Sequence, residues 1–154
     1  MVAYSYKGRF VAPIRVGLGL PVLDLHYELG GYLPGQPIRP KRQTIRATGK
    51  RRHARPGEAL QHYHGMRSPK CLKIGEGRCF AADDIRLFIR TDRIELRERH
   101  GGLSDLRTAR QLDRFAVADG FSDWAEMKAF WLDEHDGKHL GPFRGVLIRW
   151  TPLQ

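Results

Sequence analysis

Alternating apolar and less apolar residues predict a series of short β-strands through the first two thirds of the chain. In residues 2–7, Val2, Tyr4 and Tyr6 share one face, as in a strand with one buried side. Further strands are predicted at 43–46, at 58–64, in a hairpin of 71–74 with 77–82 that turns at Gly75, in a hairpin of 85–89 with 94–96, and in a closing strand over 143–150. This succession of short strands favours a small barrel over a layered α/β sheet.

Apolar residues at helical spacing predict two or three short helices. The first lies within residues 9–17, where Pro13 falls near the first turn. The second ends at Gly120, and the third begins at a Ser122 or Asp123 cap and ends at Gly137. The apolar side chains that define these helices, and that we assign to the core, are Phe10, Val11, Ile14 and Leu18, then Leu112, Phe115 and Ala116, then Trp124, Met127, Phe130 and Trp131.

The segment from Gly17 to Pro40 is rich in glycine and proline and predicts a long loop, inserted at about 18–40. Loops of this length without regular structure are uncommon in compact domains unless they cover a binding site or are disordered. Because Tyr27 and Tyr32 favour packing, we expect a lid or a pocket wall, with a surface insertion as the alternative.

A length of 154 residues suits one domain, 1–154, and the mixture of elements makes it α+β, with no internal repeats. The formal net charge of 27 − 17 = +10 is carried mostly by arginine, which favours a polyanionic or nucleotide partner. Eight of the cations lie between positions 39 and 55. Such a run is either a solvated face or a loop that steers anions toward a nearby site.

Cys71 and Cys79 are expected to be reduced, buried thiols, because the start of the chain lacks a signal-peptide pattern. No apolar run approaches the roughly 20 residues that span a bilayer, so we expect a cytoplasmic protein with no membrane partner. His62 and His64 share one side of a predicted strand, but their spacing from the cysteines is unlike that of zinc sites. We therefore expect no metal and no cofactor.

The candidate chemistry lies in the stretch 39–46, where Lys41 precedes Thr44 by three positions. A lysine and a threonine at this spacing can act as base and nucleophile, as in variants of the catalytic triad. Thr44 and Arg46 share one face of the predicted strand. The same residues can instead grip phosphate, or be an ordinary strand residue and a solvated charge.

Five motifs in the same order resemble those of ASCH domains, relatives of the PUA domain that have a small β-barrel fold. The likeness covers nearly the whole chain and is carried by Lys41-Arg-Gln-Thr44-Ile-Arg46, Arg55-Pro-Gly-Glu58, Tyr63-His-Gly-Met-Arg67, Ala118-Asp119-Gly120-Phe121 and Phe143-Arg-Gly-Val-Leu-Ile-Arg-Trp150. It implies a PUA-like barrel with two or three flanking helices.

Within that group the chain is similar to bacterial N4-acetylcytidine amidohydrolases. Their motif of a lysine, two residues and threonine-isoleucine-arginine matches Lys41, Thr44, Ile45 and Arg46, and their acidic catalytic residue falls at Asp119. Glutamate is the residue expected there, and the insertion at 18–40 is a second departure. The likeness implies a small nucleoside substrate with an N4-acylated cytosine. Because other ASCH proteins are thought to bind or cleave RNA, an RNA-binding module or a metal-independent ribonuclease is the alternative.

The roles that follow are expectations. Asp119 would hold Lys41 toward Thr44, and Arg46 or a backbone amide would stabilise the oxyanion. Burial and nearby cations would favour neutral Lys41, whereas Asp119 would favour its ammonium form. Tyr63 and Arg67 could stack on a base and contact ribose or phosphate, or be merely structural, and Lys7 is a weaker candidate of the same kind.

Overall fold

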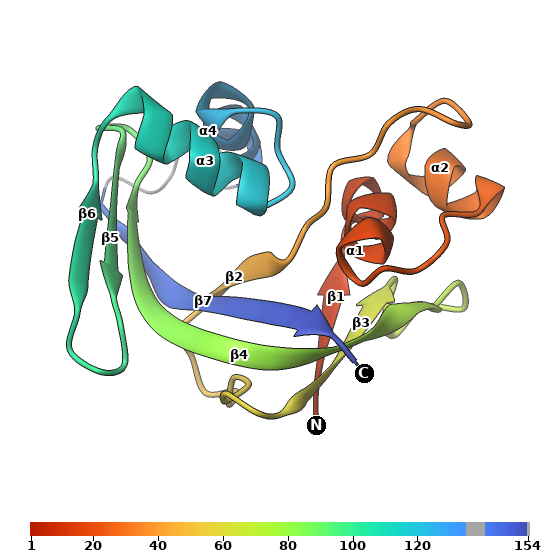
Figure 1. The fold of residues 1–154 in the computed structure, drawn as a ribbon, viewed down its shortest axis with the longest axis horizontal. Helices are drawn as coiled ribbons and strands as arrows, with labels where there is room; N and C mark the ends of the chain where they lie inside the picture. Colours follow the sequence, from red (N-terminus) through yellow and green to blue (C-terminus); the bar gives the residue numbers. More distant parts are fainter. Residues whose placement is uncertain (135–140, 154) are drawn as a thin grey trace.

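A seven-stranded sheet that curls into a half-barrel forms the frame of the protein (Figure 1). The structure is a computed structural model that describes residues 1–134 and 141–153. One path of paired strands is β1 (Val2–Tyr6), β3 (Ala59–His64), β4 (Leu72–Phe88), β5 (Arg93–Arg97) and β6 (Leu103–Leu106). On the other side of β4, β7 (Phe143–Pro152) pairs with both β4 and β2 (Gln43–Ala47). Among the paired strands of the described residues, only β1 and β3 run parallel.

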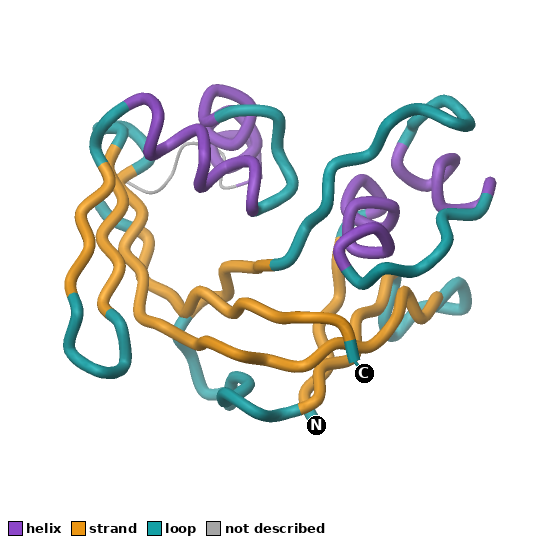
Figure 2. The backbone as a smooth tube through the Cα atoms, in the orientation of Figure 1, coloured by secondary structure: helices purple, strands orange, loops and turns teal. Residues whose placement is uncertain are grey.

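Four α-helices in the described ranges cover the two ends of this sheet. The helices are α1 (Val11–Gly17), preceded by the single turn η1 (Gly8–Phe10), then α2 (Asp24–Gly30), α3 (Ala109–Ala118) and α4 (Trp124–Glu134). In Figure 2, α1 and α2 lie together over one end of the sheet, and α3 and α4 lie together over the other. The short strand β2 lies between the two helical pairs. The α+β class is confirmed, with four α-helices in the described residues where two or three were predicted.

Local capping explains where the two late helices begin. The Thr108 hydroxyl accepts a hydrogen bond from the Gln111 amide at 3.1 Å, and the Gln111 side chain accepts one from the Thr108 amide at 3.1 Å. This reciprocal pair satisfies two amides that the first turn of α3 leaves free. At α4, Asp123 Oδ1 accepts from the Glu126 amide at 2.8 Å, so Asp123 is the cap. The predicted helix end at Gly137 lies outside the described residues.

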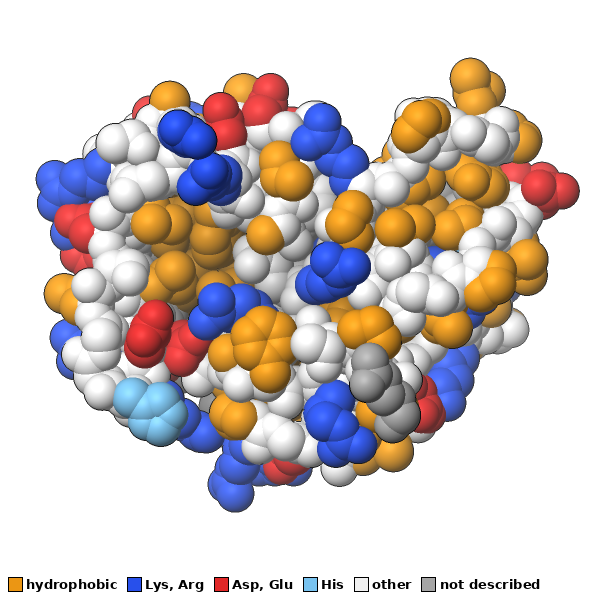
Figure 3. Space-filling view, viewed as in Figure 1, with side chains coloured by type: hydrophobic (Ala, Val, Ile, Leu, Met, Phe, Trp, Pro, Cys, Tyr) orange, Lys and Arg blue, Asp and Glu red, His pale blue; other side chains and the backbone are white. Residues whose placement is uncertain are grey.

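The additional helix α2 corrects the prediction of an unstructured loop over 18–40. Its first turn is closed by the Leu23 amide, which donates to His26 Nδ1 at 2.9 Å, and its end is made by Gly31 in the left-handed conformation, with φ of 72°. The many glycines and prolines conceal a sequence of only seven helical residues. Apolar side chains gather on the surface around α2 (Figure 3). In the segment 18–40, Leu23 and Leu33 are exposed.

The predicted hairpin around Gly75 is also wrong, because residues 72–88 form one strand, β4. A Cβ at Gly75 would lie 2.8 Å from Leu18 Cδ1 and 2.7 Å from Leu20 Cδ1. The glycine therefore makes room for the chain that follows α1 and does not make a turn. The second predicted hairpin is confirmed, since the end of β4 pairs with β5 from Asp84 to Phe88.

The predictions for β1, β2, β3 and β7 are confirmed, including burial of Val2, Tyr4 and Tyr6 on one face of β1. Of the two free cysteines, Cys79 is buried, whereas Cys71 is exposed and does not fit the expectation of a buried thiol. Among the helices in the described part of the chain, none has the length and apolar character needed to cross a bilayer.

The end of α1 packs directly against the backbone that leads into β2. A Cβ at Gly17 would lie 2.1 Å from the Lys41 carbonyl oxygen, and the Lys41 amide donates to the Pro13 carbonyl at 2.9 Å. Arg42 Nε donates to the Gly17 carbonyl at 3.1 Å. These contacts fix the position of the chain at residue 41.

Gly17→Ala is expected to lower the free energy of unfolding by about 1–3 kcal/mol, because the new methyl group must push the backbone at Lys41 away. Urea unfolding monitored by circular dichroism measures the change. Gly49→Ala is the matched control, since a Cβ there meets no atom within 4 Å. Equal stabilities of the two variants would contradict the close approach of α1 to the start of β2.

Candidate active site

A cavity of about 360 Å³ opens where β1 ends, β2 begins and α4 passes over both. Its lining brings together residues that are far apart in the sequence: Tyr6 and Lys7 from the first strand and the turn after it, Phe10 from η1, Lys41, Thr44 and Arg46 from the second strand and the residues before it, Asp119 from the end of α3, and Trp131 and Glu134 from α4. The three residues predicted to be catalytic therefore face one cavity.

Lys41 and Asp119 form a buried ion pair at this cavity. The Lys41 Nζ–Asp119 Oδ1 distance is 3.3 Å, and the two side chains are only 3% and 6% exposed. The Lys41 amine also donates to the Asp119 backbone carbonyl, and Gln43 Nε2 donates to Asp119 Oδ1 at 3.4 Å. The amine lies 4.6 Å from the centre of the Phe10 ring. The contact on which the sequence hypothesis depends is present.

The turn after α3 is built to accept this lysine. Asp119 is the C-cap residue of α3, and Gly120 follows it with φ of +99°, a conformation that favours glycine. A Cβ at Gly120 would lie 3.1 Å from Lys41 Cδ. The predicted helix terminator is thus confirmed, and it also leaves space for the side chain of Lys41.

Burial shifts both partners of the pair toward their neutral forms. The pKa of Lys41 is lowered from its ordinary value, first by desolvation and then by the charges of Arg46 and Arg9, while Asp119 acts against this shift. The pKa of Asp119 is raised by desolvation, against the effect of Lys41, Gln43 and Arg46. A lowered pKa moves a lysine in the direction that a general base requires.

Thr44 is buried and lines the cavity, but no hydrogen bond joins its hydroxyl to the Lys41 amine in the described residues. Tyr6 lines the same cavity, and the Arg46 guanidinium lies over its ring. Desolvation raises the pKa of Tyr6, so the phenol stays protonated at neutral pH and can donate. Thr44, Tyr6 and Lys41 thus line the same cavity.

Arg46 is a fixed positive charge beside these groups. Its guanidinium lies over the rings of Tyr4 and Tyr6, at 5.1 and 4.7 Å from their centres, and its Nη2 donates to the Ser5 carbonyl at 2.9 Å. Its buried Nε has no hydrogen-bond partner in the described residues. Stacking on two rings holds the charge in place without neutralising it.

Behind Tyr6 lies a buried histidine that the sequence analysis did not assign to the site. A hydrogen bond of 2.9 Å joins the Tyr6 hydroxyl to His62 Nδ1, and the His62 ring lies 4.5 Å from that of Trp150. Within the described chain, His62 Nε2 and Trp150 Nε1 are buried without partners. Burial and the charges of Arg46 and Lys41 lower the pKa of His62 to about 3, so the ring is neutral.

Of the four predicted substrate-binding residues, Lys7 and Arg46 line the cavity and the other two do not. Lys7 lies at the cavity and forms an ion pair with Glu134. Tyr63 and Arg67 do not line the cavity: Tyr63 bonds to Gln61 at 3.3 Å, and Arg67 is exposed in the turn after β3 with φ of 67°. The segment 18–40 does not line it either, which disagrees with a lid or wall over this site.

The residues that the sequence analysis missed are Tyr6, His62 and Gln43. The alternation in β1 and β3 predicted only that Tyr6 and His62 would be buried or ordinary strand residues. The sequence did contain one signal for Tyr6 and His62: both are polar residues at positions predicted to be buried in strands. Because buried polar groups need hydrogen-bond partners, such residues are candidates for a bond to each other. Their pairing depends on the parallel register of β1 with β3, which places Tyr6 beside His64 and Tyr4 beside His62.

Comparison with known proteins adds no family to this description: no protein-family model, curated protein or solved structure matches the chain. In the described residues, no three His, Cys, Asp or Glu side chains lie close enough together to form a metal site.

The stability of the protein is expected to fall as the pH drops from 6.5 toward 3, because the unfolded chain binds a proton at His62 that the folded chain, with a pKa of about 3, does not. The slope from this group is roughly 1 kcal/mol per pH unit. Urea unfolding of wild type and His62→Gln between pH 7 and 5 measures the contribution of His62 to this pH dependence. Paired carboxylates contribute little in this range, because they become protonated mainly at lower pH. Parallel curves for the two proteins would refute the assignment.

Proposed function

We propose that this protein is an amidohydrolase that removes the acyl group from the N4 amine of N4-acylated cytosine nucleosides. The single observation that carries the proposal is the buried Lys41–Asp119 pair, at 3.3 Å, in a cavity that Thr44 also lines. The ASCH-like order of motifs supports it, and the curled half-barrel is compatible with the PUA-like fold that those motifs imply.

The burial of Lys41 favours catalysis over a simple grip on phosphate. A lysine that binds phosphate through its charge needs an exposed ammonium group, but this side chain is 3% exposed and already paired with Asp119. Desolvation moves it toward the neutral amine instead. A neutral amine can accept a proton from a hydroxyl, whereas an ammonium ion cannot.

In the proposed reaction, Thr44 Oγ1 attacks the acyl carbonyl carbon and its proton passes to Lys41 Nζ. The C–N4 bond then breaks, and Lys41 returns the proton to the departing N4 amine. Water hydrolyses the acyl ester of Thr44, which releases a carboxylic acid and restores the hydroxyl. Because the Lys41 amine rests on Asp119 and not on Thr44, it must turn toward Thr44 when the substrate binds. Asp119 thus fixes the resting position of the base.

The developing oxyanion would be stabilised by groups that are already fixed. Arg46 supplies a positive charge held by two tyrosine rings, and the Tyr6 hydroxyl can donate as well in the His62 tautomer whose Nδ1–H donates to Tyr6. At the mouth of the cavity, the rings of Trp131 and Phe143 lie 4.8 Å apart and offer apolar surface for a pyrimidine. The Lys7–Glu134 pair offers polar groups for ribose.

Lys41→Met is expected to lower kcat for N4-acetylcytidine by about 10²–10⁴-fold, because it removes the base and keeps the volume of the side chain. Release of cytidine is followed by mass spectrometry, with and without chelator. Lys73→Met, which replaces an exposed lysine on β4, is the matched control and should retain full activity. Cleavage of a labelled RNA with N4-acetylcytidine left intact would instead support the ribonuclease alternative.

Thr44→Ser should retain measurable hydrolysis, since the hydroxyl nucleophile is kept, and Thr44→Ala should lose it. The same assay applies, with rapid-quench mass spectrometry to detect the acylated protein in Thr44→Ser. An active Thr44→Ala protein would remove Thr44 from the mechanism while leaving Lys41 and Asp119 to act on water directly.

A further inference from the structure

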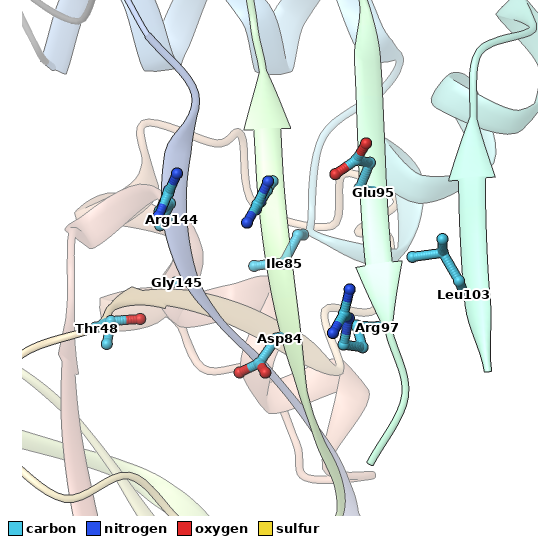
Figure 4. A pocket seen from close by; sticks show the side chains of 9 residues that line it. Thr48, Asp84, Ile85, Glu95, Arg97, Leu103, Arg144 and Gly145 are labelled. Atoms are coloured by element: carbon cyan, nitrogen blue, oxygen red, sulfur yellow. The ribbon is translucent and has the colours of Figure 1, made fainter. Parts of the chain in front are cut away.

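A second cavity, of about 470 Å³, lies over strands β7, β4 and β5, away from Lys41 (Figure 4). Arginines from each of the three strands line it: Arg144 from β7, Arg86 from β4 and Arg97 from β5. Thr48, directly after β2, adds a hydroxyl. We call these four residues the arginine groove.

The sheet register places two of these arginines directly against each other. Arg86 on β4 is the cross-strand neighbour of Arg144 on β7, and both side chains are exposed. Like charges in directly opposed positions repel, so such a pair is unfavourable for the fold alone. Within the described residues, neither Arg86 nor Arg144 forms a hydrogen bond or an ion pair through its side chain. The two charges are available to an anion from outside.

The acidic side chains of the cavity do not neutralise this pair. Glu95 on β5 is the cross-strand neighbour of Arg86, but its carboxylate pairs with Arg93, which also binds Asp105 at 3.0 Å. Asp84 lies beside Arg97, its cross-strand neighbour on β5. An anion is therefore directed to the Arg86–Arg144 side of the groove. Because the lining mixes arginines with carboxylates, it suits a ligand with separate phosphate groups at defined positions better than a ligand whose whole surface is anionic.

The two cavities are neighbours along the same pair of strands. Ala47 and Phe143 line the cavity that holds Lys41, and the next residues in the chain, Thr48 and Arg144, line the arginine groove. Beyond Thr48 the chain continues into the basic loop 49–57. Because successive residues of a strand point to opposite faces, the two cavities lie on opposite faces of β2–β7, and a polyanion bound in the groove would reach the first cavity by passing around this end of the strand pair.

We propose that the arginine groove binds the phosphodiester backbone of a single-stranded nucleic acid. Guanidinium groups match phosphate oxygens in a bidentate geometry, and three of them span two strand spacings, about 10 Å, which accommodates neighbouring phosphates. The exposed Leu103 at the edge of the groove gives apolar surface for a base. The net charge of +10 adds long-range attraction. If the proposed amidohydrolase activity holds, the groove would present an N4-acylated cytidine within a strand to Lys41 and Thr44.

Fluorescence anisotropy with labelled 12-nucleotide RNA and DNA tests the binding. Arg86→Gln/Arg144→Gln should weaken binding at least tenfold and reduce the slope of log K against log salt by about 1 to 1.5, the value for two phosphate contacts on a single strand. The matched control is Arg110→Gln/Arg114→Gln, which removes the same charge from exposed positions on α3 and should change affinity less than threefold. The RNA and DNA arms show which backbone is preferred.

If the groove variant and the α3 control variant weaken binding equally, the proposal is overturned, because net charge alone would then explain binding. A wild-type protein that binds neither RNA nor DNA would also overturn it. Arg86→Lys/Arg144→Lys, which keeps the charges, should preserve most of the salt slope. Thermal unfolding should show no loss of stability in the glutamine variant, since it relieves a repulsion.

Hydrolysis assays separate this proposal from the amidohydrolase. The groove variant should hydrolyse free N4-acetylcytidine at the wild-type rate and an oligonucleotide that contains it at least tenfold more slowly at limiting substrate. If the wild-type protein hydrolyses neither free N4-acetylcytidine nor the oligonucleotide, the amidohydrolase proposal is refuted, and the result of the binding assay is unaffected. Equal rates of wild type and variant on the oligonucleotide would refute delivery by the groove.

Discussion

The buried pair of Lys41 and Asp119 is the interaction on which the proposed site depends. Removing two charges from water is costly, and their mutual attraction repays that cost only when the geometry is good and the remaining polar atoms are satisfied. Here the amine has both the carboxylate and the backbone carbonyl of Asp119, and Gln43 supplies a further donor to the carboxylate. The pair also joins the end of α3 to the start of β2. The desolvation that makes it expensive is what moves Lys41 toward a neutral base.

Several neighbouring features serve to hold this pair in place. The end of α1 meets the backbone at Lys41 so closely that only glycine fits at position 17, and Gly120 leaves room for the lysine side chain. On the other side, Tyr6 hydrogen-bonds to the buried His62 and faces Thr44 and Arg46. Most of these groups are rigid parts of strands or helix ends. A site on such elements is better preorganised than one on loops.

The strand pair β2–β7 separates two kinds of surface. On one side, a cavity is lined by aromatic side chains and by Lys41, which is paired with Asp119. On the other, an exposed groove carries Arg86 and Arg144, whose side chains form no ion pair among the described residues. In the proposed function, this division gives the excess positive charge a role separate from that of the buried lysine: the charge would attract a polyanion, and the lysine would act as the base. It also relates the two possible substrates, a free nucleoside and a nucleotide within a strand.

Sequence alone predicted the elements whose signals are local. Alternation predicted β1, β2 and β3, helical spacing with caps predicted α3 and α4, and the lysine–threonine motif indicated the candidate catalytic residues. It failed where tertiary contacts decide the role of a residue: Gly75 was read as a turn but makes room for two leucines, and the glycines and prolines of 18–40 concealed α2. Tyr63 and Arg67, chosen for their chemistry, lie away from the cavity.

What only the tertiary structure decided is which charges are buried together and which are left exposed. Lys41 and Asp119 are 78 positions apart, and although the family resemblance predicted that they meet, nothing local to either residue does. The same holds for Arg86 and Arg144, whose opposition follows from the register of β4 with β7. A sequence specifies the charges and the periods of its elements, but pKa values and anion sites depend on distance and desolvation, which exist only once the sheet has curled and the helices have closed over it.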